Sequence, residues 1–276
     1  MILPMRAPLA CLLLPLALAS GGCELMIAGP REQASDRWEK TYEVSPTATL
    51  EVDNTNGSIS VRSHTNPTIQ VVAHRTARAV SQEGARDLLG RMRLEDTVTA
   101  DLVRLVTPRN QGFSMGQQVE VRYEILVPPS VTLTLTTVNG QVEVENVDGA
   151  VALETVNGGI AVRDVAGLRK AETVNGGVKL ALSGLPGPGT TIETVNGGVS
   201  VALPGSQRAD LSVRTVNGGI GVEGFASVDD AERKRRHYEG RLNGGGPTLR
   251  VETVNGSVSI SGETKATPTA TDAGAP

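Results

Sequence analysis

Residues 151–162 read VALETVNGGIAV, and the tetrapeptide T-V-N-G inside this stretch occurs six times in the chain. The asparagines of the six copies follow one another at steps of 18, 18, 21, 21 and 38 residues. A period near 20 residues is typical of stacked repeat units, which present an extended surface rather than a single pocket. The six asparagines are Asn139, Asn157, Asn175, Asn196, Asn217 and Asn255.

Apolar residues alternate on both sides of each tetrapeptide. Before the Asn157 copy, Val151 and Leu153 share one parity with Thr155, and after it Ile160 and Val162 alternate in the same way. Spacing by two places such residues on one face of a strand, which we expect to point inward. Asn-Gly tolerates positive φ, so we expect the turn between the two strands to contain a residue with positive φ.

Two all-β architectures fit this pattern. Asn-Gly between alternating apolar residues is a strong hairpin signal, which would give an antiparallel meander. Near-identical corners at a near-constant spacing favour instead a right-handed parallel β-helix, a solenoid of about six coils. In this solenoid the six asparagines and Asn56 form a stacked turn ladder, because amide side chains in register hydrogen-bond between layers.

The repeat begins before the first T-V-N-G. Residues 50–59 (LEVDNTNGSI) follow the same template, with Asn54 in the place of the threonine. The rest of 38–130 is an excursion that we expect to cap the stack, because an uncovered end would leave unpaired strand edges. The excursion contains a strand at 69–72, a short α-helix at 81–92, and a hairpin formed by 102–106 and 119–127.

The solenoid proper is expected over 131–262, with one interruption. Residues 226–247 include the charged run DDAERKRR and are expected to form a short helical or looped flap. Residues 263–276 are rich in Thr, Ala and Pro, a composition that predicts a disordered tail.

The chain starts with a targeting segment at 1–23. Its apolar run at 7–19 is too short for a transmembrane helix. The run and the small residues before Cys23 resemble a bacterial lipoprotein signal, although Ser20 stands where such signals usually carry Leu. We expect Cys23 to be lipidated, with 24–37 as a tether; plain secretion is the alternative. The protein would then be exported and attached to a membrane, facing the periplasm or the cell surface.

Composition limits the core and the partners. Aromatic residues make up 2% of the chain, so the core is aliphatic, and the net charge of −4 gives no field that would attract nucleic acid. We expect no nucleic-acid partner.

Motifs of catalysis and ligand binding lack their usual contexts. Ser114 lies in a G-x-S-x-G match at 112–116, but no helix is expected after it. The G-x-G-x-x-G match at 219–224 begins a repeat strand, and 158–166 lacks the Gly and Asp of calcium-binding nonapeptides. The three histidines are isolated from other metal ligands. We therefore expect no catalytic residue, cofactor or metal. The histidines are His64, His74 and His237.

Two rows on the outward face are candidates for contact with a partner. Glutamates stack one strand after another, with Arg214 interrupting the row; such carboxylates occur in β-helix enzymes that act on glycans, but no aromatic sugar platform lies near. The valines of T-V-N-G point outward if the threonines point inward, and an exposed apolar stripe can bind a partner. The glutamates are Glu154, Glu172, Glu193 and Glu252, and the valines singled out are Val156, Val174 and Val195.

A basic run at 233–236 is the third candidate surface. Arg233, Arg235 and Arg236 could contact acidic lipid headgroups or anionic cell-wall polymers. The alternative is a solvated, charged flap whose arginines are balanced by neighbouring acidic residues.

Several stretches resemble the bacterial putative adhesin domain, a family of unknown function found in exported and membrane-linked proteins. They are LEVDNTNGSISV (50–61), YEILVP (123–128), the ETVNGG coils and GGGPTLRVETVNGSVSI (244–260), and the resemblance spans about 38–262. It implies a β-solenoid and supplies no catalytic residues, and some relatives look linked to envelope-stress signalling. We therefore expect a non-enzymatic, adhesin-like envelope protein that binds an unknown envelope protein or polymer. A periplasmic sensor or regulator is the alternative, and a glycan-acting enzyme is a third.

Overall fold

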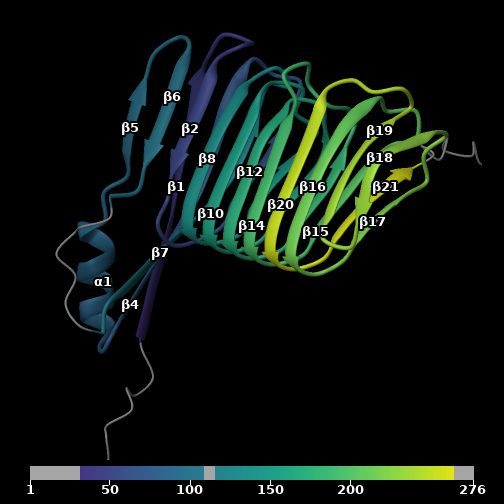
Figure 1. Ribbon diagram of the computed structural model, residues 1–276. Coiled ribbons are helices and arrows are strands. Elements are labelled where there is room, and N and C mark those ends of the chain that lie inside the picture. The colour runs from purple at the N-terminus through teal and green to yellow at the C-terminus, as the bar shows by residue number, and fades with distance from the viewer. Residues whose placement is uncertain (1–31, 109–115, 264–276) are drawn as a thin grey trace, which may run out of the picture.

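The computed structural model describes residues 32–108 and 116–263, which form two long sheets with their strands stacked side by side (Figure 1). One α-helix, α1 (Gln82–Arg91), occurs among the described residues, and no described helix is both long and apolar enough to cross a membrane. The targeting segment, Cys23 and Ser114 lie outside the described residues.

Each sheet is named here by its strand order. Sheet A runs β1 (Glu32–Glu43), β4 (Thr68–Ala79), β7 (Gln118–Val127), β3 (Ile59–Ser63), β9 (Val142–Glu145), β11 (Ile160–Val165), β13 (Val178–Leu182), β15 (Val199–Pro204), β21 (Val258–Glu263), β17 (Ile220–Glu223). Sheet B runs β18 (Val228–Lys234), β19 (His237–Leu242), β16 (Ala209–Asn217), β20 (Thr248–Asn255), β14 (Thr190–Asn196), β12 (Leu168–Asn175), β10 (Val151–Asn157), β8 (Thr132–Asn139), β2 (Thr49–Asp53), β6 (Leu102–Val106), β5 (Glu95–Val98).

The repeat strands are parallel, which excludes the hairpin meander. β10, for example, pairs in parallel with β8 and β12, and β11 pairs in parallel with β9 and β13. A coil is therefore one strand of sheet B, the T-V-N-G corner, and the next strand of sheet A. The side chains predicted to point inward are buried between the sheets, with Leu133, Leu153 and Ile160 among the most deeply buried.

The coils are not stacked in the order of the sequence. Coil β2–β3 lies between β6–β7 and β8–β9, and coil β20–β21 lies between β14–β15 and β16–β17. At the first end the chain forms β2–β3, then the outer coil β6–β7, and then continues with β8–β9 on the other side of β2–β3. At the other end it passes over one position, which β20–β21 later fills. This non-sequential order was not predicted, because the spacing of the repeats records only how far apart they lie in the chain.

At the first end of the stack, antiparallel strands extend both sheets, and a helix packs on two of the added strands. β4 pairs antiparallel with β7 and β1 with β4, while β5 pairs antiparallel with β6. α1 begins after its N-cap Ser81, whose side chain accepts a hydrogen bond from the Gly84 N–H, and it buries Ala85, Leu88 and Leu89 against β1 and β4. The predicted helix at 81–92 is therefore confirmed within a residue at each end.

Three predicted details of the connecting segments are wrong. Residues 102–106 and 119–127 do not form a hairpin, because β6 belongs to sheet B and β7 to sheet A, where they make a further coil. The flap at 226–247 is an antiparallel hairpin of β18 and β19 rather than a helix or loop. The segment predicted as a tether at 24–37 overlaps β1, which begins at Glu32.

The role of glycine at the T-V-N-G corner also differs from the prediction. Among the described corner glycines only Gly57 has a positive φ. A Cβ on Gly158 would lie 2.0 Å from the carbonyl oxygen of Gly140, and one on Gly176 would lie 1.9 Å from that of Gly158. Glycine is thus required by the close approach of successive coils rather than by φ. Positive φ occurs instead at the opposite corner, at Asn146 and Asp164.

Candidate functional site

The valines of T-V-N-G form an exposed row on the outer face of sheet B. Thr155 points inward and is buried, so Val156, the next residue, points outward. The pairing in register repeats this arrangement from strand to strand. Between 38% and 52% of each of five valines is exposed, which is high for an apolar residue in a regular strand: Val156, Val174, Val195, Val254 and Val216. We call this set the Val row; Val138 lies at its start and is half-buried.

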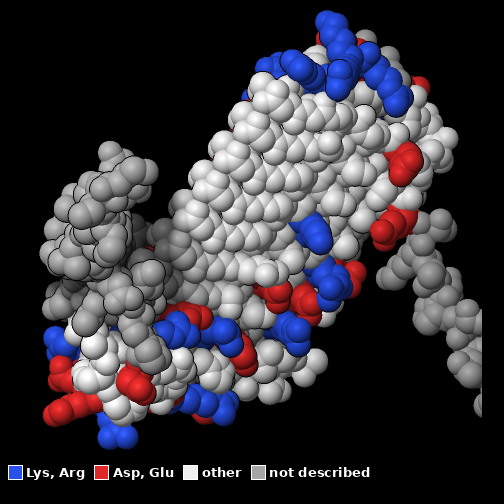
Figure 2. Space-filling view, turned by 90° about the horizontal axis from the view of Figure 1, so that it is seen from below, with Lys and Arg blue, Asp and Glu red and all other residues white. Residues whose placement is uncertain are grey.

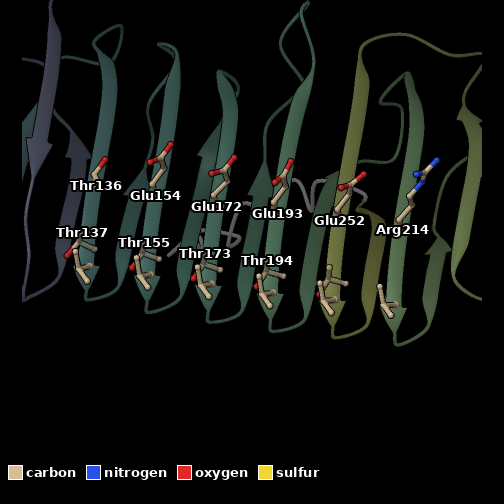
Figure 3. A pocket seen from close by; sticks show the side chains of 17 residues that line it. Thr136, Thr137, Glu154, Thr155, Glu172, Thr173, Glu193, Thr194, Arg214 and Glu252 are labelled. Carbon is tan, nitrogen blue, oxygen red and sulfur yellow. The ribbon is translucent and has the colours of Figure 1, made fainter.

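A row of glutamates runs beside the Val row on the same face. Glu154 pairs in register with Glu172, Glu172 with Glu193, and Glu193 with Glu252 (Figure 3). Arg214 does not interrupt this Glu row, as predicted from the sequence, but follows it. β20 lies between β14 and β16, so Glu252 is next to Glu193 and Arg214 comes after Glu252.

Basic side chains two residues away on the same face neutralise part of the Glu row. The Lys170 ammonium lies 2.7 Å from a Glu154 carboxylate oxygen and 2.9 Å from one of Glu172. These hydrogen bonds, first to Glu154 and then to Glu172, raise the pKa of Lys170 to about 12. Arg250 binds Glu252 at 2.6 Å. Lys170 and Arg250 were missed at the sequence level, although both share the outward parity of the glutamate that follows them by two residues.

Glu193 differs from its neighbours in the row. On its own strand, the residue in register with Lys170 is Thr191, which carries no charge. Glu193 itself is exposed. Within the described part of the chain its carboxylate has no ion-pair or hydrogen-bond partner. An anionic group is therefore left unneutralised in the middle of the row, between Glu172 and Glu252.

The Val row and the Glu row together border a shallow groove of about 660 Å³. It runs across six strands, from β8 to β16, and is lined by the valines, the glutamates, Arg214 and the threonines at the corner. Figure 3 shows the glutamate side chains pointing outward above the threonines. The groove is amphipathic from β10 to β16, because one side carries the valines and the other carries the glutamates and Arg214, whereas β8 contributes the uncharged Thr136. We call it the Val–Glu groove.

The predicted turn ladder is present at the corner beside the groove. The Asn157 amide donates to the Asn139 carbonyl at 2.8 Å, and Asn175 donates to Asn157 at 2.9 Å. The same bond links Asn139 to Asn56 at the first end and Asn217 to Asn255 at the last. Seen from the corner side, the middle of the stack carries a broad face without charged side chains, with Lys and Arg gathered at the end away from the first cap (Figure 2).

The basic run spans the end of β18 and its turn to β19, next to the end of the Val row. The backbone carbonyl of Arg236 accepts a hydrogen bond from the N–H of Thr215 at 3.0 Å, next to Val216. Arg233, Arg235 and Arg236 are exposed, and the guanidinium of Arg233 lies 6.0 Å from the centre of the Tyr238 ring. The two partner surfaces predicted separately are therefore adjacent, because β19 pairs with β16.

The remaining motif residues are spread over the molecule. His64 contacts the Thr68 carbonyl, His74 lies near Glu124, and His237 lies near Glu232 and Glu239. No cluster of three or more His, Cys, Asp or Glu able to hold a metal occurs in residues 32–108 and 116–263. The glycines at 219–224 surround β17 and lead to another strand, β18, so they do not open a helix.

Comparisons with known proteins found distantly similar solved structures. Solved structures similar to this chain include a putative cell adhesion protein from Clostridium sporogenes (13% identity, 83% of this chain and 100% of that chain covered, TM-score 0.47). A putative adhesin from Bacteroides fragilis has 10% identity, coverage of 83% and 97%, and a TM-score of 0.30. A putative lipid binding protein from Parabacteroides distasonis has 7% identity, coverage of 83% and 96%, and a TM-score of 0.24.

Sequence comparison identifies the family of the chain. No functionally curated protein matches the chain. Residues 39–261 match the sequence profile described as Toastrack DUF4097, a domain of unknown function, and this match covers most of the chain. The protein therefore belongs to the Toastrack DUF4097 family.

Proposed function

We propose that this protein is a non-enzymatic, adhesin-like binding protein of the bacterial envelope, and that the Val–Glu groove is its binding surface. In this proposal the chain is exported, is attached to a membrane through a lipid on Cys23, and folds as a right-handed solenoid with the six T-V-N-G repeats at its centre. The observation that carries the proposal is the Val row, a continuous apolar stripe on an otherwise polar face.

The shape of the groove favours an elongated partner. Adjacent strands in a sheet lie about 4.8 Å apart, so equivalent valines and glutamates recur at that interval along the stack. A partner that lies along the stack axis meets a valine and a glutamate at four neighbouring strands, β10, β12, β14 and β20. Many weak, identical contacts then add up, as in repeat proteins that bind through an extended surface. An envelope polymer or an elongated protein segment has this form.

The charged side of the groove is organised for binding rather than for acid–base chemistry. Glu154 and Glu172 share the ammonium of Lys170, and Glu252 is engaged by Arg250. A glycosidase needs one carboxyl group that donates a proton to the leaving oxygen and a second that acts on the sugar, without permanent ion-pair partners. We therefore propose that the carboxylates position a partner, with the unpaired Glu193 as the contact for a cationic or hydrogen-bond-donating group.

Photo-crosslinking in cells tests the groove. A benzoylphenylalanine at Val174 is expected to form a defined adduct with the envelope component that occupies the groove. The matched control is the same residue at Ala181, on the outer face of sheet A. The adduct is expected to be lost when Val156 and Val195 are changed to Ser. Equal adducts at Val174 and Ala181, or none at either, would contradict the groove as the binding surface.

Protease accessibility on intact and permeabilised cells decides where the groove acts. Degradation on intact cells would place the solenoid outside the cell and favour surface binding. Protection until permeabilisation would place the groove in the periplasm and direct the search to a periplasmic partner. A protein that stays in the soluble fraction when Cys23 is intact would contradict the lipid anchor.

A further inference from the structure

The four ends of the two sheets are not closed in the same way. Sheet A begins with β1, which pairs antiparallel with β4, and β4 in turn pairs antiparallel with β7; sheet B begins with β5, which pairs antiparallel with β6. At the other end of the stack, sheet B is closed by β19 and β18. Sheet A ends there on β17, a repeat strand whose one partner among the described strands is β21. Within residues 32–108 and 116–263, one edge of the stacked coils is therefore left without a pairing strand.

The hydrogen-bonding groups on this open edge can be assigned from the pairing. The Val258 N–H donates to the Gly219 carbonyl at 2.9 Å. In a parallel strand, every second residue directs both its N–H and its C=O group toward the same neighbouring strand. Residues with the parity of Gly219 therefore direct these groups toward β21. Ile220 and Val222 have the other parity and direct their N–H and C=O groups toward the open edge. Two donors and two acceptors are thus aligned there for another strand.

The side chains of β17 also leave room for an added strand. Ile220 and Val222 are half-buried and pack on the end of the core, whereas the repeat residues before them in the stack, such as Val258, are fully buried. No atom lies within 4 Å of the place where a Cβ on Gly221 would stand. Edge strands are usually protected by Lys, Pro or a bulge, and β17 (IGVE) has none of these.

A cluster of positive charge lies at the corner that leads into β17. Arg235 and Arg236 are exposed, and the backbone of Arg236 is bonded to Thr215, at the start of the last T-V-N-G corner. Neither arginine has an ion-pair partner among the described residues. An acidic group is therefore favoured at the corner end of anything that pairs with β17.

We propose that β17 binds an extended segment of a partner protein, which adds a strand to sheet A. Alternate apolar side chains of the segment cover Ile220 and Val222, and acidic residues at its corner end contact Arg235 and Arg236. Strand addition of this kind draws its affinity from main-chain hydrogen bonds and its specificity from alternate side chains. A four-residue edge is small beside the roughly 800 Å² per partner of a stable protein interface, which favours a segment over a second copy of the chain.

The proposal is independent of the Val–Glu groove and has its own probe. The probe is the peptide NGSVSIS, which is the sequence of residues 255–261 that already pairs with β17, extended by two glutamates at its N-terminus. Amide NMR of the purified protein is expected to show shifts at Ile220 and Val222 on addition of the peptide. The same peptide with two lysines is expected to bind about tenfold more weakly at low salt, and Arg235→Glu with Arg236→Glu is expected to reverse this order.

Two variants separate strand addition from other binding. Val222→Pro removes an N–H that faces the open edge and spares the bonds to β21, so it should keep the fold and reduce affinity at least about tenfold. Glu223→Gln, whose backbone faces β21, should leave affinity unchanged. Slow hydrogen exchange at Ile220 and Val222 without peptide, or shifts centred elsewhere, would overturn the proposal. A dimer that Val222→Pro dissociates would assign the edge to a second copy instead.

Discussion

The two corners of each coil obey different constraints. At the T-V-N-G corner successive coils touch: the Thr173 hydroxyl donates to the Gly158 carbonyl at 2.9 Å, and a Cβ on Gly176 would overlap that same carbonyl oxygen. The opposite corner is less regular: a Cβ on Gly167 would lie 1.9 Å from the Gly149 carbonyl oxygen, but this corner also carries the PGPG loop at 186–189 and the departures to β4 and β18. The repeated tetrapeptide therefore marks the corner where the same close contact recurs from coil to coil, and the opposite corner is the one where insertions interrupt such contacts.

The largest effect that this comparison predicts is for an added methyl group. Gly176→Ala places a Cβ 1.9 Å from the Gly158 carbonyl oxygen, and neither backbone can move without disturbing its own neighbours. We expect a loss of about 3 kcal/mol or more in the free energy of unfolding, measured by urea denaturation.

The matched control is Gly187→Ala at the opposite corner. Gly187 is exposed, and no atom lies within 4 Å of the place where the added methyl group would stand, so we expect a change within about 0.5 kcal/mol. Equal losses for Gly176→Ala and Gly187→Ala would show that the two corners are equally constrained, against the comparison.

The threonine of the tetrapeptide should give the next largest effect. Thr173→Val keeps the shape of a buried side chain but removes its hydrogen bond, which leaves the Gly158 carbonyl without that donor. We expect a loss of about 1–2 kcal/mol. Thr191→Val on the outward face of sheet B is the control and should change stability by less than about 0.5 kcal/mol. A smaller loss for Thr173→Val than for Thr191→Val would mean that threonine is selected at this position for its strand propensity and not for its hydrogen bond.

The asparagine ladder allows the middle and the end of one corner to be compared. Asn175 donates to Asn157 and accepts from Asn196, whereas Asn217 at the end of the ladder donates to Asn255 and has no following coil. Because these amides are exposed, we expect a loss of about 1 kcal/mol for Asn175→Ala and about half of that for Asn217→Ala, by thermal or urea unfolding. A greater loss at Asn217 would argue against additive bonds along the ladder.

The difference between the corners also explains what could be predicted from the sequence. The buried positions, the asparagine ladder and the outward valines follow from local parity around T-V-N-G, and the structure contains them. The reason for glycine was predicted wrongly, because a close contact between coils and a need for positive φ select the same residue. Only the position of the neighbouring carbonyl distinguishes them.

Long-range order could not be predicted from the sequence. The sequence of β20–β21 does not indicate that this coil is stacked between β14–β15 and β16–β17, because every coil offers nearly the same surface to its neighbours. Stacking the coils in chain order therefore places Arg214 within the Glu row instead of at its end. For the same reason 102–106 and 119–127, two strands separated by a polar segment, have the pattern of a hairpin although they belong to opposite sheets.

The smallest predicted effect concerns the outer faces of the sheets, where ion pairs between charged side chains add to the backbone pairing of neighbouring coils. The pKa of Lys170 is raised to about 12 because the ammonium is bound by Glu154 and then by Glu172. A folded pKa above the ordinary 10.5 means that the stabilisation is fully present below pH 10.5 and is lost as the pH rises through about 12. Since the side chain is 38% exposed, we expect the pair to contribute less than about 1 kcal/mol. Unfolding of the native protein and of Lys170→Gln, compared at pH 9 and pH 12, should show a stability difference that shrinks at the higher pH and in high salt. A difference that is independent of both would mean that Lys170 stabilises the sheet by packing its methylene groups along the Glu row rather than through its charge.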